Sequence, residues 1–153
     1  MEKEAFSDTI RGLEPRLYRI ACGQLRDVND QADAVQEAIL KAWRKLPTLR
    51  NDDLFETWLI RILLNECHNL QRTQKRFVPV DNLPDPGYLP DMHSELRETI
   101  WNLPDKLRIP VQLYYIEGYD TYEIAEILRV PNGTVCSRLN RARARMKQSL
   151  EDD

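Results

Sequence analysis

The sequence predicts an all-α protein of two small helical domains, an N-terminal helical bundle and a C-terminal helix-turn-helix domain, joined by a proline-rich linker. Several segments repeat apolar residues every three or four positions, which is the period of an amphipathic helix. Between them, residues 77–94 ("FVPVDNLPDPGYLPDMHS") hold four prolines and no sustained period, as expected of an extended linker. Near the end, residues 130–147 ("VPNGTVCSRLNRARARMK") hold five basic side chains and no acid, although the formal net charge of the chain is -3.

The bulk composition is that of a folded protein. Of the 153 residues, 42% are hydrophobic and 31% are charged, and both shares are close to globular averages. No apolar run approaches the roughly 18 residues of a membrane span, and the start "MEKEAFSDTI" lacks the basic and apolar regions of a secretory signal. The three cysteines lie far apart and form neither a disulfide framework nor a C-x-x-C pair. We therefore expect a protein of the cytoplasm.

No motif of catalysis or cofactor binding stands out. The chain has no G-x-S-x-G or H-E-x-x-H motif, and its five glycines are too sparse for a phosphate-binding loop. Cys67 and His68 are adjacent, but neighbours on a helix point about 100 degrees apart, which makes a poor start for a zinc site. We interpret Cys67 as a small buried residue and expect no enzyme, metal or cofactor. An enzyme that uses Cys67 and His68 is one alternative.

The N-terminal bundle is predicted to begin with a pair of helices. Apolar residues from Phe6 to Ala21 share one helical face. Because proline is tolerated in the first turn of a helix but not in its interior, Pro15 should separate a short helix ending at about Gly12 from a second helix over residues 14–26.

Two longer helices should follow. Asp30 is the expected N-cap of the first, which should stop at Pro47, and the second should run from Phe55 to about Lys75. We assign Trp58 to packing within the second helix. The two apolar stripes consist of Ala34, Val35, Ala38, Ile39, Ala42 and Trp43, and of Phe55, Trp58, Leu59, Ile62, Leu63, Cys67 and Leu70.

The C-terminal domain contains several cap signals. Asp91 is the expected cap of a first helix, Pro110 should bend the next helix or delay its start, and Gly118 should end it. Asp120, with Glu123 at the third helical position, predicts a capping box at the start of "TYEIAEILRV". The tight turn "VPNG" and a basic helix complete a helix-turn-helix pattern.

The last helix is predicted to face DNA with one side. Val135, Leu139, Ala142 and Met146 form its inward stripe. A helix-turn-helix lays its second helix in the DNA major groove, and arginine can bond two acceptors of guanine at once. The alternative is a solvated basic face on a purely structural hairpin. The predicted outward residues are Thr134, Ser137, Arg138, Asn140, Arg141, Arg145 and Lys147, of which residues 134–141 are the predicted base readers.

Two faces of the N-terminal bundle also carry interpretable polar residues. The helix from Phe55 is basic toward its end and interleaved with Asn65 and Asn69, whose amides can bond base edges. The face of the preceding helix begins with acids and would there repel DNA and suit a basic protein partner. It consists of Asp33, Gln36 and Glu37 beside Lys41 and Arg44. An ordinary polar surface explains the first face equally well, and the helix dipole explains the acids of the second.

Three segments resemble one known family. "DAVQEAILKAW" at residues 33–43, "FETWLIRILLNECHNLQR" at 55–72, and "LPDKLRIPVQLYYIEGYDTYEIAEILRVPNGTVCSRLNRARARMK" at 103–147 are similar to extracytoplasmic-function (ECF) sigma factors, the group 4 bacterial transcription initiation factors of the sigma-70 family. The segments occur in the order and spacing of the family and cover nearly the whole chain.

The resemblance implies a division of labour along the chain. Residues 1–76 would be sigma region 2, residues 77–94 the linker, and residues 95–153 sigma region 4. Region 2 would bind core RNA polymerase and the minus-ten element, and region 4 would bind the minus-thirty-five element. The minus-thirty-five residues would be Thr134, Ser137, Arg138, Asn140, Arg141 and Arg145. The polymerase-binding residues would be Asp33, Gln36, Glu37 and Lys41, and the minus-ten residues Arg50, Asn51, Asp52, Arg61, Asn65, Asn69 and Arg72.

The partners implied by the resemblance are the clamp of the polymerase's largest subunit, the polymerase flap, promoter DNA and an anti-sigma factor. Two positions depart from the family pattern: Ala34 replaces a larger aliphatic residue, and Cys136 replaces an arginine or lysine, so one expected DNA contact is missing. A helix-turn-helix regulator that binds an operator by itself, as a dimer, is the other alternative.

Overall fold

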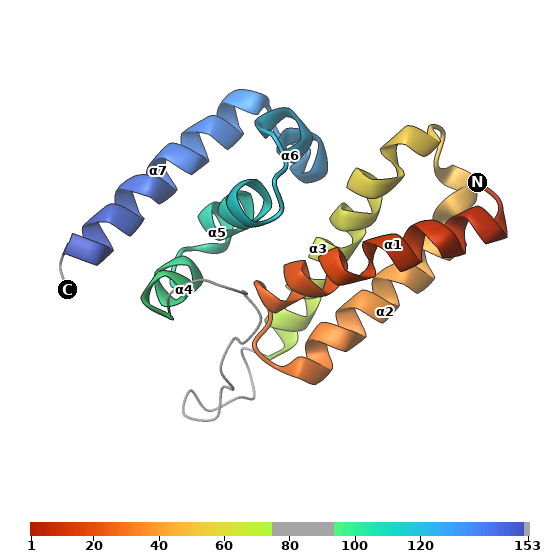
Figure 1. Cartoon of the computed structure of the whole chain (residues 1–153), viewed down its shortest axis with the longest axis horizontal. Helices are drawn as coiled ribbons and strands as arrows, with labels where there is room; N and C mark the ends of the chain where they lie inside the picture. Colours follow the sequence, from red (N-terminus) through yellow and green to blue (C-terminus); the bar gives the residue numbers. More distant parts are fainter. Residues whose placement is uncertain (75–93, 152–153) are drawn as a thin grey trace. The chain divides into compact units, whose positions relative to one another are not determined.

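The computed structural model of the chain describes residues 1–74 and 94–151, whose regular elements are helices (Figure 1). The chain divides into two compact units, Met1–Tyr88 and Leu89–Asp153. The prediction of an all-α protein with two helical domains is therefore confirmed. The predicted linker, apart from residue 94, and the predicted cap Asp91 lie outside the described residues.

The first unit is a bundle of α1 (Lys3–Cys22), α2 (Val28–Lys45) and α3 (Phe55–Gln74). α2 packs against both other helices, and two short 3-10 turns, η1 (Leu46–Thr48) and η2 (Asp52–Leu54), connect it to α3 (Figure 1). Aromatic rings join the three helices, because the Phe6 ring lies 5.1 Å from Trp43 and 5.7 Å from Phe55. The largest fully buried side chains here are Leu17, Ile20, Leu25, Val35, Leu59, Ile60 and Leu63.

The predicted break at Pro15 is wrong. α1 continues through Pro15 to Cys22, so the helix predicted over residues 14–26 does not exist separately. Pro15 is exposed, while Ile10 before it and Leu17 after it are buried on the same helical face. The packing of this face against α2 and α3 outweighs the roughly 3 kcal/mol that an interior proline costs.

α2 begins about one turn earlier than predicted. Its N-cap is Asp27 rather than Asp30, because Oδ1 of Asp27 accepts hydrogen bonds from the backbone amides of Asn29 (2.7 Å) and Asp30 (3.2 Å). Asp30 therefore lies in the first helical turn. α2 ends at Lys45, and Pro47 falls in the 3-10 turn that follows.

The second unit contains α4 (Ser94–Trp101), α5 (Asp105–Val111), α6 (Thr121–Leu128) and α7 (Asn132–Glu151), with the π-helical segment η4 (Gln112–Ile116) directly after α5. α7 packs against α4, α5 and α6. The apolar core of this unit consists of Ile100, Leu103, Leu107, Val111, Leu113, Ile124, Ile127, Val135, Leu139 and Ala142.

Pro110 does not delay the start of α5. It lies buried inside the helix, which begins at Asp105. The chain then widens into the π turn, where the amide of Glu117 donates to the carbonyl of Gln112 at 3.1 Å. A π turn adds one residue to a helical turn and rotates the side chains that follow it. Gly118, with φ of 82°, ends the segment as predicted.

Candidate nucleic-acid interface

α6 and α7 form the helix-turn-helix. The predicted capping box is confirmed: Oδ1 of Asp120 accepts from the amide of Glu123 (2.8 Å), and Oε1 of Glu123 accepts from the amide of Asp120 (3.1 Å). The turn differs from the prediction of a glycine turn, because Arg129 takes the left-handed conformation, with φ of 56°. Gly133 lies in the first turn of α7 instead.

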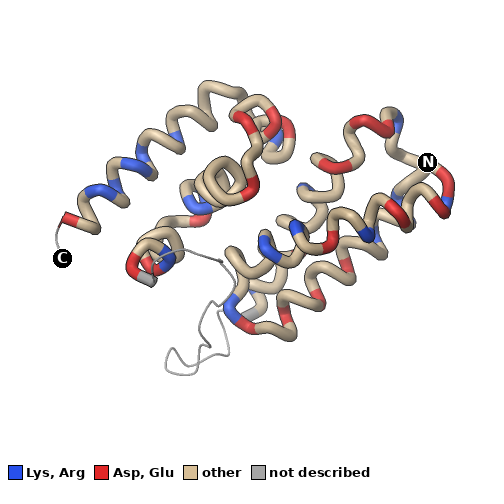
Figure 2. Tube along the Cα trace, viewed as in Figure 1, with Lys and Arg blue, Asp and Glu red and all other residues tan. Residues whose placement is uncertain are grey.

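α7 keeps its apolar stripe inside and most of its polar side chains outside. Val135, Leu139 and Ala142 are buried, and Nδ2 of Asn132 donates to Oγ1 of Thr121 (2.9 Å), which ties the starts of the two helices together. Lys and Arg recur along most of α7 (Figure 2). Among the predicted DNA-binding residues of α7, Ser137, Asn140, Arg141 and Arg145 are exposed, and Thr134 and Arg138 are half-buried.

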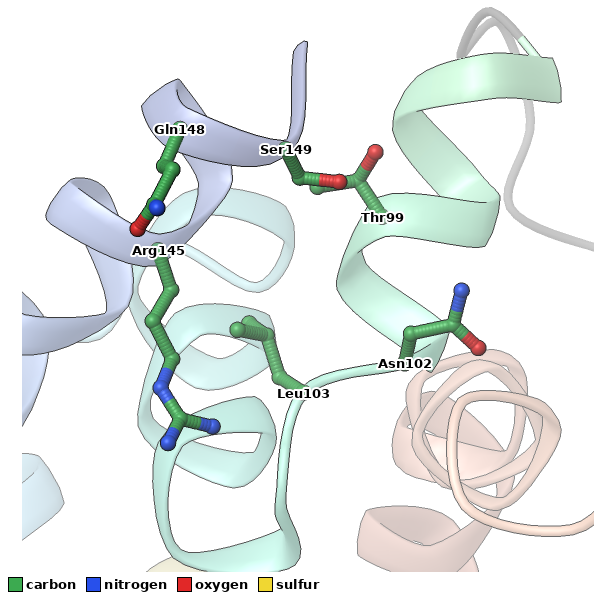
Figure 3. Close-up of a pocket in the computed structure, with 6 residues that line it drawn as sticks. All are labelled: Thr99, Asn102, Leu103, Arg145, Gln148 and Ser149. Carbon is green, nitrogen blue, oxygen red and sulfur yellow. The ribbon is translucent and has the colours of Figure 1, made fainter. Parts of the chain in front are cut away.

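Two hollows flank α7. In one, of about 310 Å3, Ser149 of α7 faces Thr99 of α4, and Arg145 extends past Leu103 (Figure 3). The other, of about 390 Å3, is bordered by Lys106, Arg141 and Arg145. Within the described residues, neither Arg141 nor Arg145 makes a hydrogen bond or ion pair. Both guanidinium groups are therefore available to an external acceptor, such as a base edge or a phosphate.

On the other flank of α7, three side chains are linked that the sequence did not single out together. Nε of Arg143 donates to the hydroxyl of Tyr115 (2.5 Å), and Nη1 of Arg143 donates to Oδ1 of Asn140 (2.7 Å). The ring of Tyr114 packs edge-on against that of Tyr115, with centroids 4.9 Å apart. Tyr115 is 52% exposed. Its exposure beside the buried stripe of α7 becomes evident only when the position of η4 is known, so the sequence alone could not single it out.

Cys136 lies exposed near the start of α7, and its Sγ is 3.5 Å from Oδ1 of Asn132. A thiol is a weak donor and cannot replace the charge or the paired donors of arginine. Cys136 therefore lies on the exposed surface of α7, at a position where an arginine or lysine was expected.

The predicted minus-ten residues gather on one side of α3 and in the loop before it. Arg61, Asn65, Asn69 and Arg72 are spaced by four, four and three residues, which places them on one helical face. Arg61 is half-buried and the other three are exposed. Trp58 is half-buried, with its ring 5.9 Å from that of Phe55, in agreement with packing.

In the loop, Arg50, Asn51 and Asp52 are exposed. Oδ1 of Asn51 accepts from the amide of Asp53 (3.0 Å) and so caps η2. One polar atom of this loop therefore serves local structure, while Arg50 and Asp52 lie at the surface.

The first half of α2 presents acids at its surface, and exposed Leu40 and Arg44 follow on the same face. Asp33 and Gln36 are exposed and Glu37 is half-buried, and acids recur along α2 (Figure 2). Leu40 is 50% exposed and lies one helical turn further along the same face. Leu40 could have been recognised in the sequence as a large apolar residue outside the apolar stripe predicted for this helix. Lys41 differs from the rest of the predicted polymerase set, because its ammonium bonds Glu66 of α3.

The environment of Cys67 does not support a reactive thiol. Burial, followed by the nearby Glu66 and Cys22, raises the pKa of the Cys67 thiol to about 12, whereas the adjacent His68 is exposed. A thiol with that pKa is protonated at neutral pH, and the thiolate is the nucleophilic form. In residues 1–74 and 94–151, no cluster of His, Cys, Asp and Glu could hold a metal ion, and no helix is long and apolar enough to cross a membrane.

The comparison with known families agrees with the two units. The family model of sigma-70 region 2 matches residues 9–77, and that of sigma-70 region 4 matches residues 93–146. Together these regions define a sigma-70 type sigma factor, a class of transcription regulators rather than a family of catalytic enzymes.

Curated relatives narrow the class further. The chain is 34% identical to the ECF RNA polymerase sigma-E factor of Haemophilus influenzae, over 80% of this chain and 76% of that protein. It is 28% identical to the ECF RNA polymerase sigma factor SigW of Bacillus subtilis, over 99% of this chain and 91% of that one. The chain belongs to the ECF sigma factors, as the sequence motifs predicted.

Solved structures share the fold. CnrH in complex with the cytosolic domain of CnrY has a TM-score of 0.78 at 26% identity, and covers 99% of this chain and 91% of CnrH. The sigma factor RpoE of Bartonella quintana, in complex with the anti-sigma factor NepR, has a TM-score of 0.79 at 23% identity, with 98% and 99% of the two chains covered.

Proposed function

We propose that this sigma factor binds core RNA polymerase and the minus-ten element with its first unit, and reads the minus-thirty-five element with α7 of its second. The observation that carries the proposal is a separation of charge. Acids lie on the exposed side of the first half of α2, in sigma-70 region 2, whereas α7, in region 4, holds five basic residues before its first acid at Glu151. The two surfaces therefore suit partners of opposite charge.

Asp33, Gln36 and Glu37 dock on the clamp of the polymerase's largest subunit, and the second unit meets the flap. Acids on α2 favour association with a basic surface and set the register of docking. Leu40 adds exposed apolar area in the same face, and burying that area against a partner is favourable. Lys41 supports this face by holding α2 on α3 through Glu66.

The minus-ten residues act on melted DNA. The loop residues Arg50, Asn51 and Asp52 receive a flipped base of the non-template strand. The polar face of α3 contacts the promoter DNA next to that base through Arg61, Asn65, Asn69 and Arg72. Holding an unstacked base stabilises the open duplex without ATP hydrolysis, because binding favours the open form over the closed one.

In the second unit, the residues from Thr134 to Arg141 face base edges, and Arg145 lies further along, where phosphate contacts are expected. The chain needs no catalytic group of its own for this function, and we place it in the cytoplasm with the polymerase. An anti-sigma factor holds it inactive. CnrH and the RpoE of Bartonella quintana, which share the fold, were both solved with a protein partner, and in the second case the partner is an anti-sigma factor.

Run-off transcription with purified core polymerase tests the function. Arg141→Ala should weaken minus-thirty-five recognition by about 1 to 3 kcal/mol per lost base contact while core binding is retained. Glu37→Ala should weaken core binding, and Glu14→Ala, which removes an exposed acid of α1, is its matched control. Specific binding of a duplex by the isolated chain, with no binding to core, would support an operator-binding regulator instead.

A further inference from the structure

The linked side chains of Tyr115, Arg143 and Asn140 bear on which base α7 selects. Arg143 bridges the other two, with Nε on the Tyr115 hydroxyl and Nη1 on Oδ1 of Asn140. Its guanidinium carbon also lies 5.7 Å from the centre of the Tyr115 ring. Asn140 is exposed on the outward side of α7, between the predicted readers Ser137 and Arg141.

The bridge changes what Asn140 can offer to DNA. The amide oxygen of Asn140 has two lone pairs, and Nη1 of Arg143 bonds one of them and places a positive charge beside the other. In the described part of the chain nothing accepts a hydrogen bond from Nδ2 of Asn140. Because guanidinium carries donors and no acceptor, a second donor is disfavoured beside Oδ1, and Asn140 and Arg143 together present mainly donors.

The four bases present different hydrogen-bonding groups to a protein surface that consists mainly of donors. Guanine presents two acceptors in the major groove, O6 and N7, whereas adenine presents N7 next to its own N6 donor. An asparagine with both amide atoms available favours adenine, because it bonds N6 and N7 at once. With the charge of Arg143 beside the oxygen, the bond from the N6 donor of adenine is weakened, and guanine, which presents two acceptors, becomes the better match.

We propose that Tyr115 and Arg143 are positioning residues that make Asn140 act mainly as a donor, so that it selects guanine over adenine at the base pair that it contacts. This inference rests on the proposed reading of the minus-thirty-five element by α7. Tyr115 supplies the fixed point of the arrangement. Its ring is held by Tyr114 at 4.9 Å, and both tyrosines belong to the π turn that follows α5. The guanidinium of Arg143 is therefore held by two partners, Tyr115 through Nε and Asn140 through Nη1.

The test uses holoenzyme and a library of promoter duplexes randomised across the minus-thirty-five region, with bound sequences counted. Asn140→Ala identifies the base pair, because the preference at that position alone should disappear. There, native holoenzyme should favour guanine over adenine by about tenfold. Arg143→Met should bring the two bases within about threefold or favour adenine, and Tyr115→Phe should move the ratio in the same direction. Tyr114→Phe, which keeps the packed ring, is the matched control and should leave the ratio unchanged.

The ratio of two bases is insensitive to a uniform loss of phosphate binding, so the lost charge of Arg143 does not confuse the result. A native preference for adenine at the Asn140-dependent position, or a guanine preference that survives Arg143→Met, overturns the inference. If Asn140→Ala alters no position while Arg141→Ala does, the inference fails and the proposed function stands. If neither variant alters any position, the proposed reading by α7 fails as well.

Discussion

Replacing Lys41 with methionine should destabilise the first unit, because it leaves the carboxylate of Glu66 buried without its partner. Glu66 is only 9% exposed and lies on α3, while Lys41 reaches it from α2. Lys41 is the one partner that Glu66 has within the described residues. The variant keeps the length and most of the apolar volume of the side chain, so the change is mainly one of charge.

The size of the effect follows from burial. Breaking a fully buried ion pair from one side costs about 3 to 5 kcal/mol. The Glu66 side chain is 11% exposed and that of Lys41 is 33% exposed, so water can reach the carboxylate once the ammonium is gone. We therefore expect a loss of about 2 kcal/mol in the free energy of unfolding. In a unit of this size that corresponds to a decrease in melting temperature of roughly 10 °C.

Calorimetry of the full chain measures the melting temperatures, and a second variant separates stability from function. Lys41→Met combined with Glu66→Leu removes both charges and should recover most of the lost stability, because an apolar pair replaces a buried ion pair at little net cost. If Lys41 acts by holding α2 on α3, the double variant should also recover core polymerase binding. Lys45→Met, at an exposed lysine of α2, is the matched control.

Two results would refute this reasoning. A Lys41→Met variant with the native melting temperature would mean that the pair contributes no stability. A double variant that is stable yet does not bind core polymerase would mean that Lys41 contacts the polymerase directly, as the family resemblance first suggested.

Three further predictions concern local features. Asp120→Ala removes the side-chain cap of α6 and should cost about 1 kcal/mol of unfolding free energy in the second unit, measured by calorimetry. Native protein should react quickly with a thiol reagent at Cys136 alone, because the other two cysteines are buried. Burial raises the pKa of the Cys22 thiol, and burial together with the nearby Glu66 and Cys22 raises the pKa of the Cys67 thiol to about 12. Asp30→Asn should stabilise the protein at neutral pH, because burial and two neighbouring aspartates raise the pKa of the Asp30 carboxyl above 3.8.

The sign of the last effect follows from proton binding. A raised pKa means that the folded state holds a proton on Asp30 more tightly than the unfolded state does, so stability from this group is lost as pH rises through the folded pKa. The advantage of Asp30→Asn should therefore be present at pH 7 and vanish below about pH 3.8. An advantage that is constant across this range would assign the effect to something other than ionisation. More than one thiol reacting quickly without denaturant would contradict the burial of the other two.

Local sequence patterns determined most of the helices and which of their faces are buried or exposed. The capping box at Asp120, the stripe from Val135 to Ala142 and the basic surface of α7 all depend on residues three or four positions apart, which are neighbours on any helix. The same holds for the face of α3 from Arg61 to Arg72. These relations exist before the helices pack, so they can be predicted from the order of residues alone.

Tertiary structure decided the features that depend on distant residues or on competing local signals. α1 passes through Pro15 because the buried face on both sides of it is held by other helices, and Asp27 competes with Asp30 for the cap of α2. Lys41 meets a residue 25 positions away, and Arg143 meets Tyr115 at a separation of 28. Such pairs form only when packing brings two helices into register, and the π turn sets that register for Tyr115. The sequence by itself thus determined the class of protein and its two surfaces of opposite charge. Packing determined which charged side chains on them remain available to a partner.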